Sequence, residues 1–487
     1  MNGKKEIKVA SAQNKCKSKK RGKIIIFACL GAIVCLICLG LLFFLPKSKT
    51  SEKINPTGLI CTYSPSQYSF DENSVMQIDV NIDANEFKKM MGNPEKKDLH
   101  EASAKVDGKK YGKIGLRTRG NATMAKNTDM KTYRYNLELR LDAYEDDLNY
   151  NGVESINLNF STNYTGLLNE YISYRLMKEM GIISPECTFA FVRINGVDWG
   201  LAVAVEEVDK CFLKKNYEYT SGNLYKSVHD NDKYEDELID YWYSFKFLKL
   251  KTNKKNPDHS TFKTMAQAFV DGKDYDKYFD IDTLLRLAAV DRVTGGFDDF
   301  TALKNNFYLY EASPGFYTVI PWDLDEVFRY GADCENLMRI FPKKDGSDMT
   351  MDFNVFYTVM KNEKYRNQYE EYVRRVCGMI NDENLKPMID YCLSVTDEYH
   401  ERDNTVIYPY DRWRKDTDGG ECFIYGNIYK TACLLRDSAL SQLKGETDYF
   451  KVPEEYTQYT EEQIRAIYIK PKDYELILER LADNQLN

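Results

Sequence analysis

An uncharged run of 22 residues, Ile24 to Leu45, is the feature that most constrains how this chain of 487 residues can fold. Its length suits a helix that spans the apolar core of a bilayer. Residues 4–23 hold nine Lys and Arg and a single acid, so the positive-inside rule puts the N-terminus in the cytoplasm. The end of the run, in CLGLLFFLPKSK, has bulky residues where a signal-peptide cleavage site would need small ones. We expect a basic tail, 1–23, a retained membrane anchor, 24–45, and an exported remainder, which a cleaved signal would export as well.

The exported part is acidic and poor in histidine. Beyond residue 23 the chain has 58 Lys and Arg against 74 Asp and Glu, a net charge of −16. Such a surface repels phosphate backbones, so we expect no nucleic-acid partner. The four His residues form no HxxH or HExxH pattern, which argues against a zinc site. Eight Cys residues lie beyond the anchor, and their number permits disulfides whose pairing the sequence does not define.

The first half of the exported part is predicted to be rich in strands. Residues 46–75 contain many Ser, Pro and Asn residues and are predicted to be a stalk. Apolar and polar residues then alternate with a period of two in VMQIDVNI, SAKVDGKKYGKIGLRTRG and TYRYNLELRL. Asn195 and Gly196 join two further apolar runs, which is the strongest hairpin signal in the chain. One amphipathic helix interrupts the strands, with apolar residues at Leu168, Ile172, Leu176 and Met180 and a stop at Gly181.

From about residue 235 the pattern becomes helical. Helices are predicted in DELIDYWYSFKFLKLK, DIDTLLRLAAVDRVTGG and YEEYVRRVCGMINDENLKPMIDYCLSVTDEYHERD. A second hairpin, turning through Ser313, Pro314 and Gly315, is predicted in NNFYLYEASPGFYTVIPWDLD. The fold class expected from this order is α+β, with a β-rich half followed by a helical half that holds one hairpin.

Two carboxylates follow the second strand of that hairpin. The run Phe316 to Ile320 is apolar and β-branched, as in a buried strand, and Asp323 and Asp325 come directly after it. Such carboxylates repel each other and lose solvation unless a cation neutralises them. Oxygen ligands with few histidines favour Mg²⁺ or Mn²⁺ over Zn²⁺. Alternatively, Asp325 caps the following turn, and Asp323 pairs with an Arg such as Arg292.

An upstream segment supplies partners for these acids. TGGFDDF leaves a predicted helix through two glycines, and Asn305 and Asn306 come just before the first hairpin strand. Folding the hairpin brings Asn306 level with Asp323, and the preceding loop delivers Asp298 or Asp299 to the same place. Phosphoryl transfer needs this set, because one acid orients a hydroxyl nucleophile while an acid and an amide hold a metal ion on the phosphates.

The β-rich half is expected to supply cations for those phosphates. Arg117 and Arg119 share one face of a predicted strand and precede a Gly-Asn turn, and Lys131 stands at the start of the next strand. The alternative is that these residues form an ordinary solvated strand face. Glu170, near the start of the amphipathic helix, is predicted to face solvent or to pair with a strand Lys.

Seven segments in the order of this sequence resemble the spore-coat CotH kinases. They are RTRGNAT, KTYRYNLEL, LMKEMGI, RINGVDWGLAVAVEEVD, GNLYK, NNFYLY and IPWDLD. The resemblance implies an atypical, bilobal protein-kinase-like fold with a β-rich N-lobe (76–225), a helical C-lobe with the catalytic hairpin (226–395) and a helical extension (396–487). It also implies an activity: phosphorylation of Ser on extracytoplasmic or spore-coat proteins, with ATP and a divalent metal.

Site residues carry over from the resemblance by position. Asp298 matches the catalytic acid, with Asp299 adjacent to it, and Asp323 matches the metal-binding acid, with Asn306 as its amide companion and Asp325 as a second ligand. Lys131 is predicted to contact phosphate, Arg117 and Arg119 match the RxRG element, and Glu206 ends the central hairpin where the nucleotide base is expected.

Two other function classes remain open from the sequence. Nucleotide-sugar glycosyltransferases also hold a metal with Asp-x-Asp after a buried strand, but they expect a Rossmann-like series of parallel strands. A catalytically inactive surface or spore protein would instead use the acidic, Tyr-rich domain as a binding face. The location expected in either case is the membrane, with the domain outside the cytoplasm.

Overall fold

The structure, a computed structural model, describes residues 69–71, 74–160, 166–228, 248–296, 298–301, 304–328, 337, 355–406, 427–447 and 479. The expected basic tail, the membrane anchor and most of the stalk lie outside these residues. Within them, no helix combines the length and the apolar character that crossing a bilayer requires.

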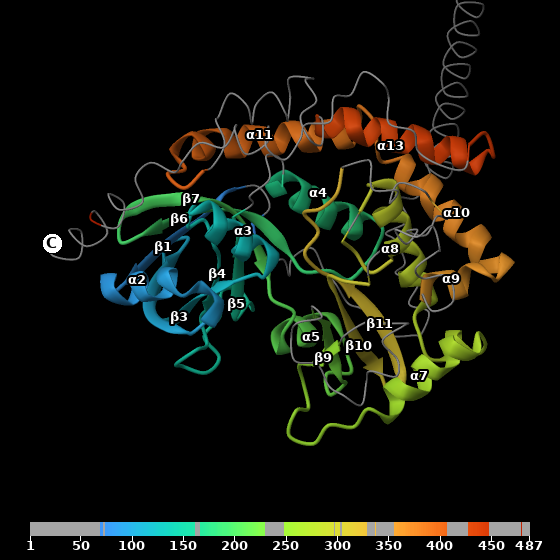
Figure 1. Ribbon diagram of the computed structural model, residues 1–487, viewed down its shortest axis with the longest axis horizontal. Coiled ribbons are helices and arrows are strands. Elements are labelled where there is room, and N and C mark those ends of the chain that lie inside the picture. The colour runs from blue at the N-terminus through green and yellow to red at the C-terminus, as the bar shows by residue number, and fades with distance from the viewer. Residues whose placement is uncertain are drawn as a thin grey trace, which may run out of the picture. The chain divides into compact units, whose positions relative to one another are not determined.

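Seven strands close into a barrel in the order β1-β2-β3-β4-β5-β7-β6 (Figure 1). Their bounds are β1 (Met76–Ile82), β2 (His100–Val106), β3 (Lys109–Arg119), β4 (Asn136–Arg140), β5 (Ser155–Asn159), β6 (Cys187–Ile194) and β7 (Val197–Glu206). Neighbouring strands are antiparallel except β1 and β6, which pair in parallel and complete the barrel. The predicted hairpin lies between β6 and β7, where Asn195 and Gly196 both have positive φ, as a tight hairpin turn requires.

The barrel interior is filled by the apolar residues of the alternating strands. Ile78, Ile114 and Leu137 are fully buried there together with Trp199. Helix α2 (Ala84–Gly92) begins at the capping carboxylate of Asp83 and covers one end of the barrel. Its Phe87 meets the Trp199 ring edge-on, with the centroids 5.4 Å apart. Period-two alternation therefore determines both the strands and the face that each one buries.

A second, four-stranded sheet has the order β11-β10-β8-β9. Its strands are β8 (Leu224–Ser227), β9 (Leu248–Leu250), β10 (Phe307–Ser313) and β11 (Phe316–Pro321). β10 and β11 form the predicted hairpin, which turns at Gly315 with φ of 77°. Apart from Ser313 and Phe316 beside the turn, every residue of this hairpin's strands is buried.

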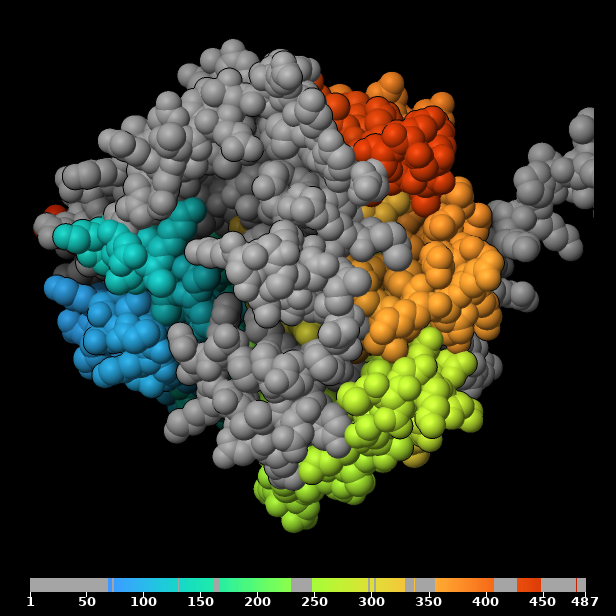
Figure 2. All heavy atoms as spheres, turned by 45° about the vertical axis from the view of Figure 1, so that its right-hand side comes forward, coloured from blue at the N-terminus to red at the C-terminus, as the bar shows by residue number. Residues whose placement is uncertain are grey.

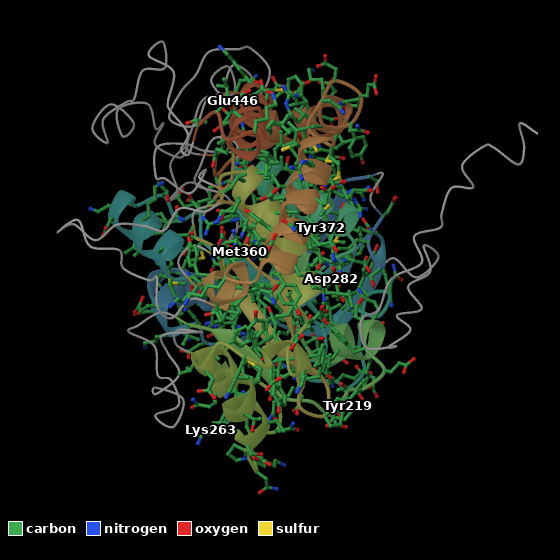
Figure 3. All side chains as sticks on the ribbon, turned by 90° about the vertical axis from the view of Figure 1, so that its right-hand side faces the viewer. Tyr219, Lys263, Asp282, Met360, Tyr372 and Glu446 are labelled. Carbon is green, nitrogen blue, oxygen red and sulfur yellow. The ribbon has the colours of Figure 1, made fainter. Side chains whose placement is uncertain are left out.

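Helices form most of the remaining described structure. They are α3 (Ala122–Met130), α4 (Gly166–Glu179), α5 (Lys210–Asn216), α7 (Ser260–Asp271), α8 (Ile281–Val293), α9 (Val355–Met360), α10 (Glu363–Cys377), α11 (Leu385–Arg402) and α13 (Ile428–Leu443), with the short 3₁₀ turns η2 (Pro94–Lys96) and η4 (Tyr275–Lys277). α7, α10 and α13 succeed one another along the face shown in Figure 2. α8 is buried at nearly every position, and Tyr372 of α10 donates a hydrogen bond to Asp282 of α8, the two residues labelled at the centre of Figure 3.

The α+β class and both hairpins are confirmed, but two local predictions were wrong. The segment predicted as one helix through Lys251 ends in strand β9, because Leu248–Leu250 pairs with β8. The residues after Gly120 form helix α3 instead of a simple turn. Lys131 consequently caps the end of that helix, with φ of 54°, and lies five residues before β4 instead of starting it.

A buried ion pair joins the barrel to the residues that follow α11. Arg134 and Asp403 are both fully buried, and Arg134 Nη1 donates to the two Asp403 carboxylate oxygens at 2.9 Å each. The N–H groups of Leu201 and Thr405 donate to the same carboxylate at 3.0 and 2.8 Å. Gly200 leaves room for it, since a Cβ there would lie 2.6 Å from an Asp403 carboxylate oxygen. The charges are therefore neutralised and hydrogen-bonded, as burial requires.

Asp403→Ala is expected to destabilise the protein by about 3–5 kcal/mol, because it leaves the Arg134 guanidinium buried without a counter-ion. Urea denaturation measures the change. The matched control is Asp198→Ala, which removes the half-exposed partner of Arg402 and is expected to cost at most about 1 kcal/mol. Equal losses in the two variants would contradict this account of the buried pair.

Candidate active site

The β10–β11 hairpin brings three predicted site residues together. Asn306 Nδ2 donates to the Asp298 carbonyl at 2.8 Å, to the Asp298 carboxylate at 3.2 Å and to the Asp323 carbonyl at 3.4 Å. Asn305 Nδ2 donates to the Asp298 carboxylate at 3.0 Å. The hairpin register sets this arrangement, because the Trp322 N–H donates to the Asn306 carbonyl at 3.1 Å just beyond the last paired residues. Two amides thus hold the Asp298 carboxylate beside the segment that carries Asp323.

Asn306 and Asp323 have left-handed backbone conformations, with φ of 52° and 56°. Asn and Asp tolerate this region better than other residues with a side chain, although it still costs energy. The Asp323 N–H donates to the hydroxyl of Tyr174 on α4 at 3.2 Å, which helps to hold the conformation. Two of the three residues predicted to bind metal therefore have a strained backbone, as is common at functional sites.

The C-terminal end of α8 fixes both loops of the site. The Gly296 N–H donates to the Asp291 carbonyl at 2.7 Å, and the Phe328 N–H donates to the Thr294 carbonyl at 2.7 Å. These bonds fasten the loop before Asp298 and the segment after Asp323 to the same helix end.

Burial resolves the choice between the two adjacent acids. Asp299 is 6% exposed, and its Oδ1 accepts the Thr301 hydroxyl at 2.9 Å. A Cβ at Gly296 would lie 2.6 Å from Asp299 Oδ2, so this carboxylate is turned back under the loop. Asp298, in contrast, is half-buried and faces the two Asn side chains. Of the two acids, Asp298 is the one presented to the site.

The carboxylates of Asp323 and Asp325 make no hydrogen bond or ion pair with any other residue that the structure describes, although that of Asp325 interacts with its own backbone N–H. Burial raises the pKa of Asp323, while the charges of Arg119 and Lys226 partly oppose the rise. The pKa of Asp325 is raised well above its usual value by burial and then by the neighbouring acids, among them Asp323 and Glu326. Arg292, an alternative partner for Asp323 in the sequence, bonds instead to the Thr301 carbonyl at 2.7 Å.

Two cations near these acids lie over aromatic rings. The Arg119 guanidinium carbon lies 5.5 Å from the Trp322 ring centroid, and Lys226 Nζ, from β8, lies 4.8 Å from the same centroid and 5.1 Å from that of Tyr308. Burial lowers the pKa of Lys226 to about 8, and the positive charges of Lys251 and Arg119 contribute to the shift. Both cations are thus held over apolar surfaces, where an incoming anion would find them poorly solvated.

Glu207 completes this polar group. It accepts the Tyr308 hydroxyl at 2.9 Å and the Asn157 amide at 2.8 Å. Although burial acts to raise its pKa, the charges of Lys226, Lys251 and Arg119 outweigh burial and the pKa is lowered. Glu207 is therefore the anionic counterpart of the two site cations.

Three other predicted residues lie away from this group. Glu206 points to the opposite side of β7, where Lys215 donates to it at 2.7 Å and to Glu186 at 2.8 Å, and burial raises its pKa to about 7. Arg117 is paired with Glu138 through its Nε at 2.8 Å. Lys131 is exposed at the end of α3, and its side chain contacts none of the site residues described above.

Glu170 is not a solvent-facing helix charge. It is 2% exposed and accepts the Asn159 amide at 2.7 and 3.0 Å, while Asn159 Oδ1 accepts a hydrogen bond from Arg119. Burial and the charge of Asp323 raise the pKa of Glu170 to about 8. A chain of polar side chains thus links α4 through β5 to the cation on β3.

The oxygen donors fit a hard divalent cation. Among the described residues no group of three or more His, Cys, Asp and Glu side chains is placed to hold a metal ion. Mg²⁺ in phosphoryl-transfer sites, however, commonly takes one or two carboxylates and completes its shell with water and substrate phosphates. Asp323, Asn306 and Asp325 supply such a set. The two carboxyl groups have raised pKa values, and a bound cation would offset this rise.

Comparison with known proteins places the chain in a family. The family model described as CotH kinase protein matches residues 116–464. The chain belongs to the CotH kinase family. It is also similar to the inner spore coat protein H of Bacillus subtilis (strain 168), with 23% identity over 265 residues that cover 49% of this chain and 67% of that protein.

CotH kinase membership implies kinase chemistry, and with it ATP, at the level of the family. The matched region contains every site residue predicted from the sequence, from Arg117 to Asp325. It also contains Lys226 and Glu207, which sequence reasoning did not select. Lys226 ends the GNLYK segment and Glu207 follows Glu206 directly, so both stood within segments that resemble the family. Their direction toward the site depends on strand pairing that the sequence alone did not reveal.

Glu207→Gln is expected to lower the pKa of Lys226 further below 8, because it removes the negative charge that favours the protonated amine. Competitive acetylation of Lys226 as a function of pH, followed by mass spectrometry, measures the change. Glu206→Gln is the matched control: this adjacent acid contacts Lys215 instead, and its loss should leave the Lys226 pKa in place. An unchanged Lys226 pKa in Glu207→Gln would contradict the assigned effect of the Glu207 charge on Lys226.

Proposed function

We propose that this protein is an atypical, ATP- and divalent-metal-dependent kinase that phosphorylates Ser on extracytoplasmic or spore-coat proteins. One observation supports this most strongly: Asp298, held by two amides, lies beside the Asp323 segment, and Arg119 and Lys226 lie over the ring of Trp322, the residue directly before Asp323. An acid, a metal-binding set and cations for phosphates are the parts that phosphoryl transfer requires.

We further propose that the fold is bilobal in the manner of protein kinases. The barrel with α4 corresponds to an N-lobe, and the four-stranded sheet with the helices around α8 corresponds to a C-lobe. The two contribute different site residues: Arg119 comes from β3, while Asp298 and Asp323 flank the β10–β11 hairpin. A nucleotide between them would contact both.

In the proposed reaction, Asp298 accepts the proton of the acceptor serine hydroxyl. The bond between Oγ and the γ-phosphorus forms as the bond from that phosphorus to the bridging oxygen breaks, and ADP leaves. Asn305 and Asn306 orient the Asp298 carboxylate, and Arg119 and Lys226 neutralise phosphate charge. A divalent cation bound by Asp323 and Asn306, with Asp325 as a further ligand, would stabilise charge on the phosphate oxygens.

The proposed location is the membrane, with a single pass through residues 24–45, the N-terminus in the cytoplasm and the kinase domain at the cell surface or spore envelope. The basic excess before that apolar run supports the orientation. The proposed acceptor is a Ser-containing protein in the same compartment.

The structure disfavours a glycosyltransferase of the Rossmann type. Within the described ranges, β1 and β6 are the one parallel pair among the named strands, and both belong to a barrel. The parallel series that such an enzyme uses to bind a nucleotide sugar is not formed there. An inactive binding protein remains the second candidate, and the following variants distinguish it from a kinase.

Asp298→Asn is expected to lower phosphate transfer by a factor of about 10²–10⁴, because the general base is lost while the Asn306 bond to the main-chain carbonyl of residue 298 remains. Transfer from radiolabelled ATP with Mg²⁺ to the protein itself and to Ser peptides measures this, with ATP binding followed separately. Asp146→Asn, at an exposed site, is the control. Wild-type protein that binds no ATP, or full transfer by Asp298→Asn, would contradict the proposal.

ATP affinity is expected to fall several-fold between pH 7.5 and 9.5, because Lys226, with a pKa of about 8, loses its charge as the pH rises through that value. Titration calorimetry at fixed ionic strength measures the affinity. Lys226→Arg keeps a positive charge across this range and should give a flatter pH profile. If both proteins show the same pH dependence, Lys226 is not the phosphate contact.

A further inference from the structure

Two arginines at the end of β3 face the outside of the barrel, and they meet different partners. They alternate with buried residues of the strand, so both lie on its outer face. The cross-strand neighbour of Arg117 on β4 is Glu138, to which the Arg117 Nε donates at 2.8 Å. The cross-strand neighbour of Arg119 is Asn136, a neutral amide. The arginine proposed to meet phosphate is therefore the one that is not opposed by an acid on the next strand.

An amide further along the same row holds Arg119. Asn159 ends β5, which pairs with β4 in the register that puts Asn159 in the row of Asn136. Its Oδ1 accepts a hydrogen bond from Arg119 Nη1. Its Nδ2 donates to the two carboxylate oxygens of Glu170 on α4, at 2.7 and 3.0 Å. The carboxylate fixes the orientation of the amide, because Nδ2 can only donate and Oδ1 is then left for the arginine.

Regular structure supports this link on both sides. Asn159 pairs with Val203 of β7, and both Asn159 and Glu170 are buried. Beyond the link, the Arg119 guanidinium carbon lies 5.5 Å from the centroid of the Trp322 ring. A guanidinium carries five N–H donors in a fixed fork, so the bond to Asn159 leaves further donors for a phosphate.

An amide and a carboxylate at position 159 would have different consequences for a bound phosphate. A carboxylate would also hold the guanidinium, but it would neutralise the charge and compete with the phosphate for the same donors. An amide oxygen holds the group without neutralising it. Glu170, the acid of this chain of contacts, orients Asn159, and no hydrogen bond or ion pair joins it to Arg119.

We propose that Asn159 is a positioning residue: oriented by Glu170, it holds the Arg119 guanidinium over Trp322 through a neutral group, so that the charge of Arg119 is kept for a phosphate. The inference rests on the proposed kinase function for the source of that phosphate, which is ATP. The hold on Arg119 itself can be measured without a nucleotide.

The decisive variant exchanges the acid and the amide. Asn159→Asp/Glu170→Gln keeps the shapes of both side chains, the number of acids and a hydrogen bond between the two positions, but it places the carboxylate against Arg119. ATP affinity, measured by titration calorimetry with Mg²⁺, is expected to fall at least about tenfold, as for the loss of one charge-assisted hydrogen bond. If the two residues served only folding, the exchanged variant would bind ATP as tightly as the wild type, and that result would overturn the proposal.

The reaction of arginine with phenylglyoxal, followed by peptide mass spectrometry without nucleotide, measures the hold on Arg119. Asn159→Leu is expected to raise the rate at Arg119 several-fold, because the guanidinium is released, and to lower ATP affinity. The exchanged variant should not raise this rate, since its carboxylate still holds the arginine. Arg117, which Glu138 holds in every variant, is the internal control. A rate at Arg119 that is the same in Asn159→Leu and the wild type would overturn the proposal.

Asn136→Leu is the matched control, because it removes an amide of the same row that bonds to the Phe160 N–H instead of to Arg119. It should leave both the Arg119 rate and the ATP affinity near those of the wild type. The exchanged variant keeps its buried hydrogen bond, so it decides the question even where Asn159→Leu does not fold. Absence of ATP binding by the wild type would overturn the kinase function, whereas the reaction rates would still decide whether Asn159 holds Arg119.

Discussion

The buried ion pair of Arg134 and Asp403 is the interaction on which the arrangement of this protein most depends. Arg134 belongs to the barrel region and Asp403 follows α11, and neither charge reaches water. Separating the partners would leave each charge buried without a counter-ion, at a large cost in free energy. The pair therefore permits one position of the α11 end on the barrel. Gly200 is required at the contact for the same reason, since any side chain there would occupy the space of the carboxylate.

The active site depends in a similar way on groups that come from different parts of the fold. The C-terminal end of α8 holds the loop before Asp298 and the segment after Asp323 through main-chain hydrogen bonds, while Arg119 reaches the same region from β3. All of these groups are buried or partly buried. Several acids there have raised pKa values, and a bound cation would favour their ionised forms.

Local sequence patterns were sufficient for the hairpins and for the convergence of Asp298, Asn306 and Asp323, since short turns fix which residues are opposite. They were insufficient for Lys226 and Glu207, whose side chains both contact Tyr308 because β8 pairs with β10 and β7 ends beside it. The closure of the barrel and the existence of strand β9 likewise could not be predicted from local patterns. Long-range pairing leaves no local period in the sequence, so the positions of these residues depend on tertiary contacts.

The parallel pairing of β1 with β6 has a consequence for how the chain reaches this structure. Asp79 and Arg193, paired across these strands, are 114 residues apart, and Arg134 and its counter-ion Asp403 are 269 residues apart. Contacts of such separation slow folding, because the loop must close before any contact repays the lost entropy. Closure of the barrel therefore requires synthesis through β7, and the buried ion pair requires synthesis through Asp403. The barrel can pack against the end of α11 only after residue 403 has been synthesised, long after its last strand, β7, which ends at Glu206.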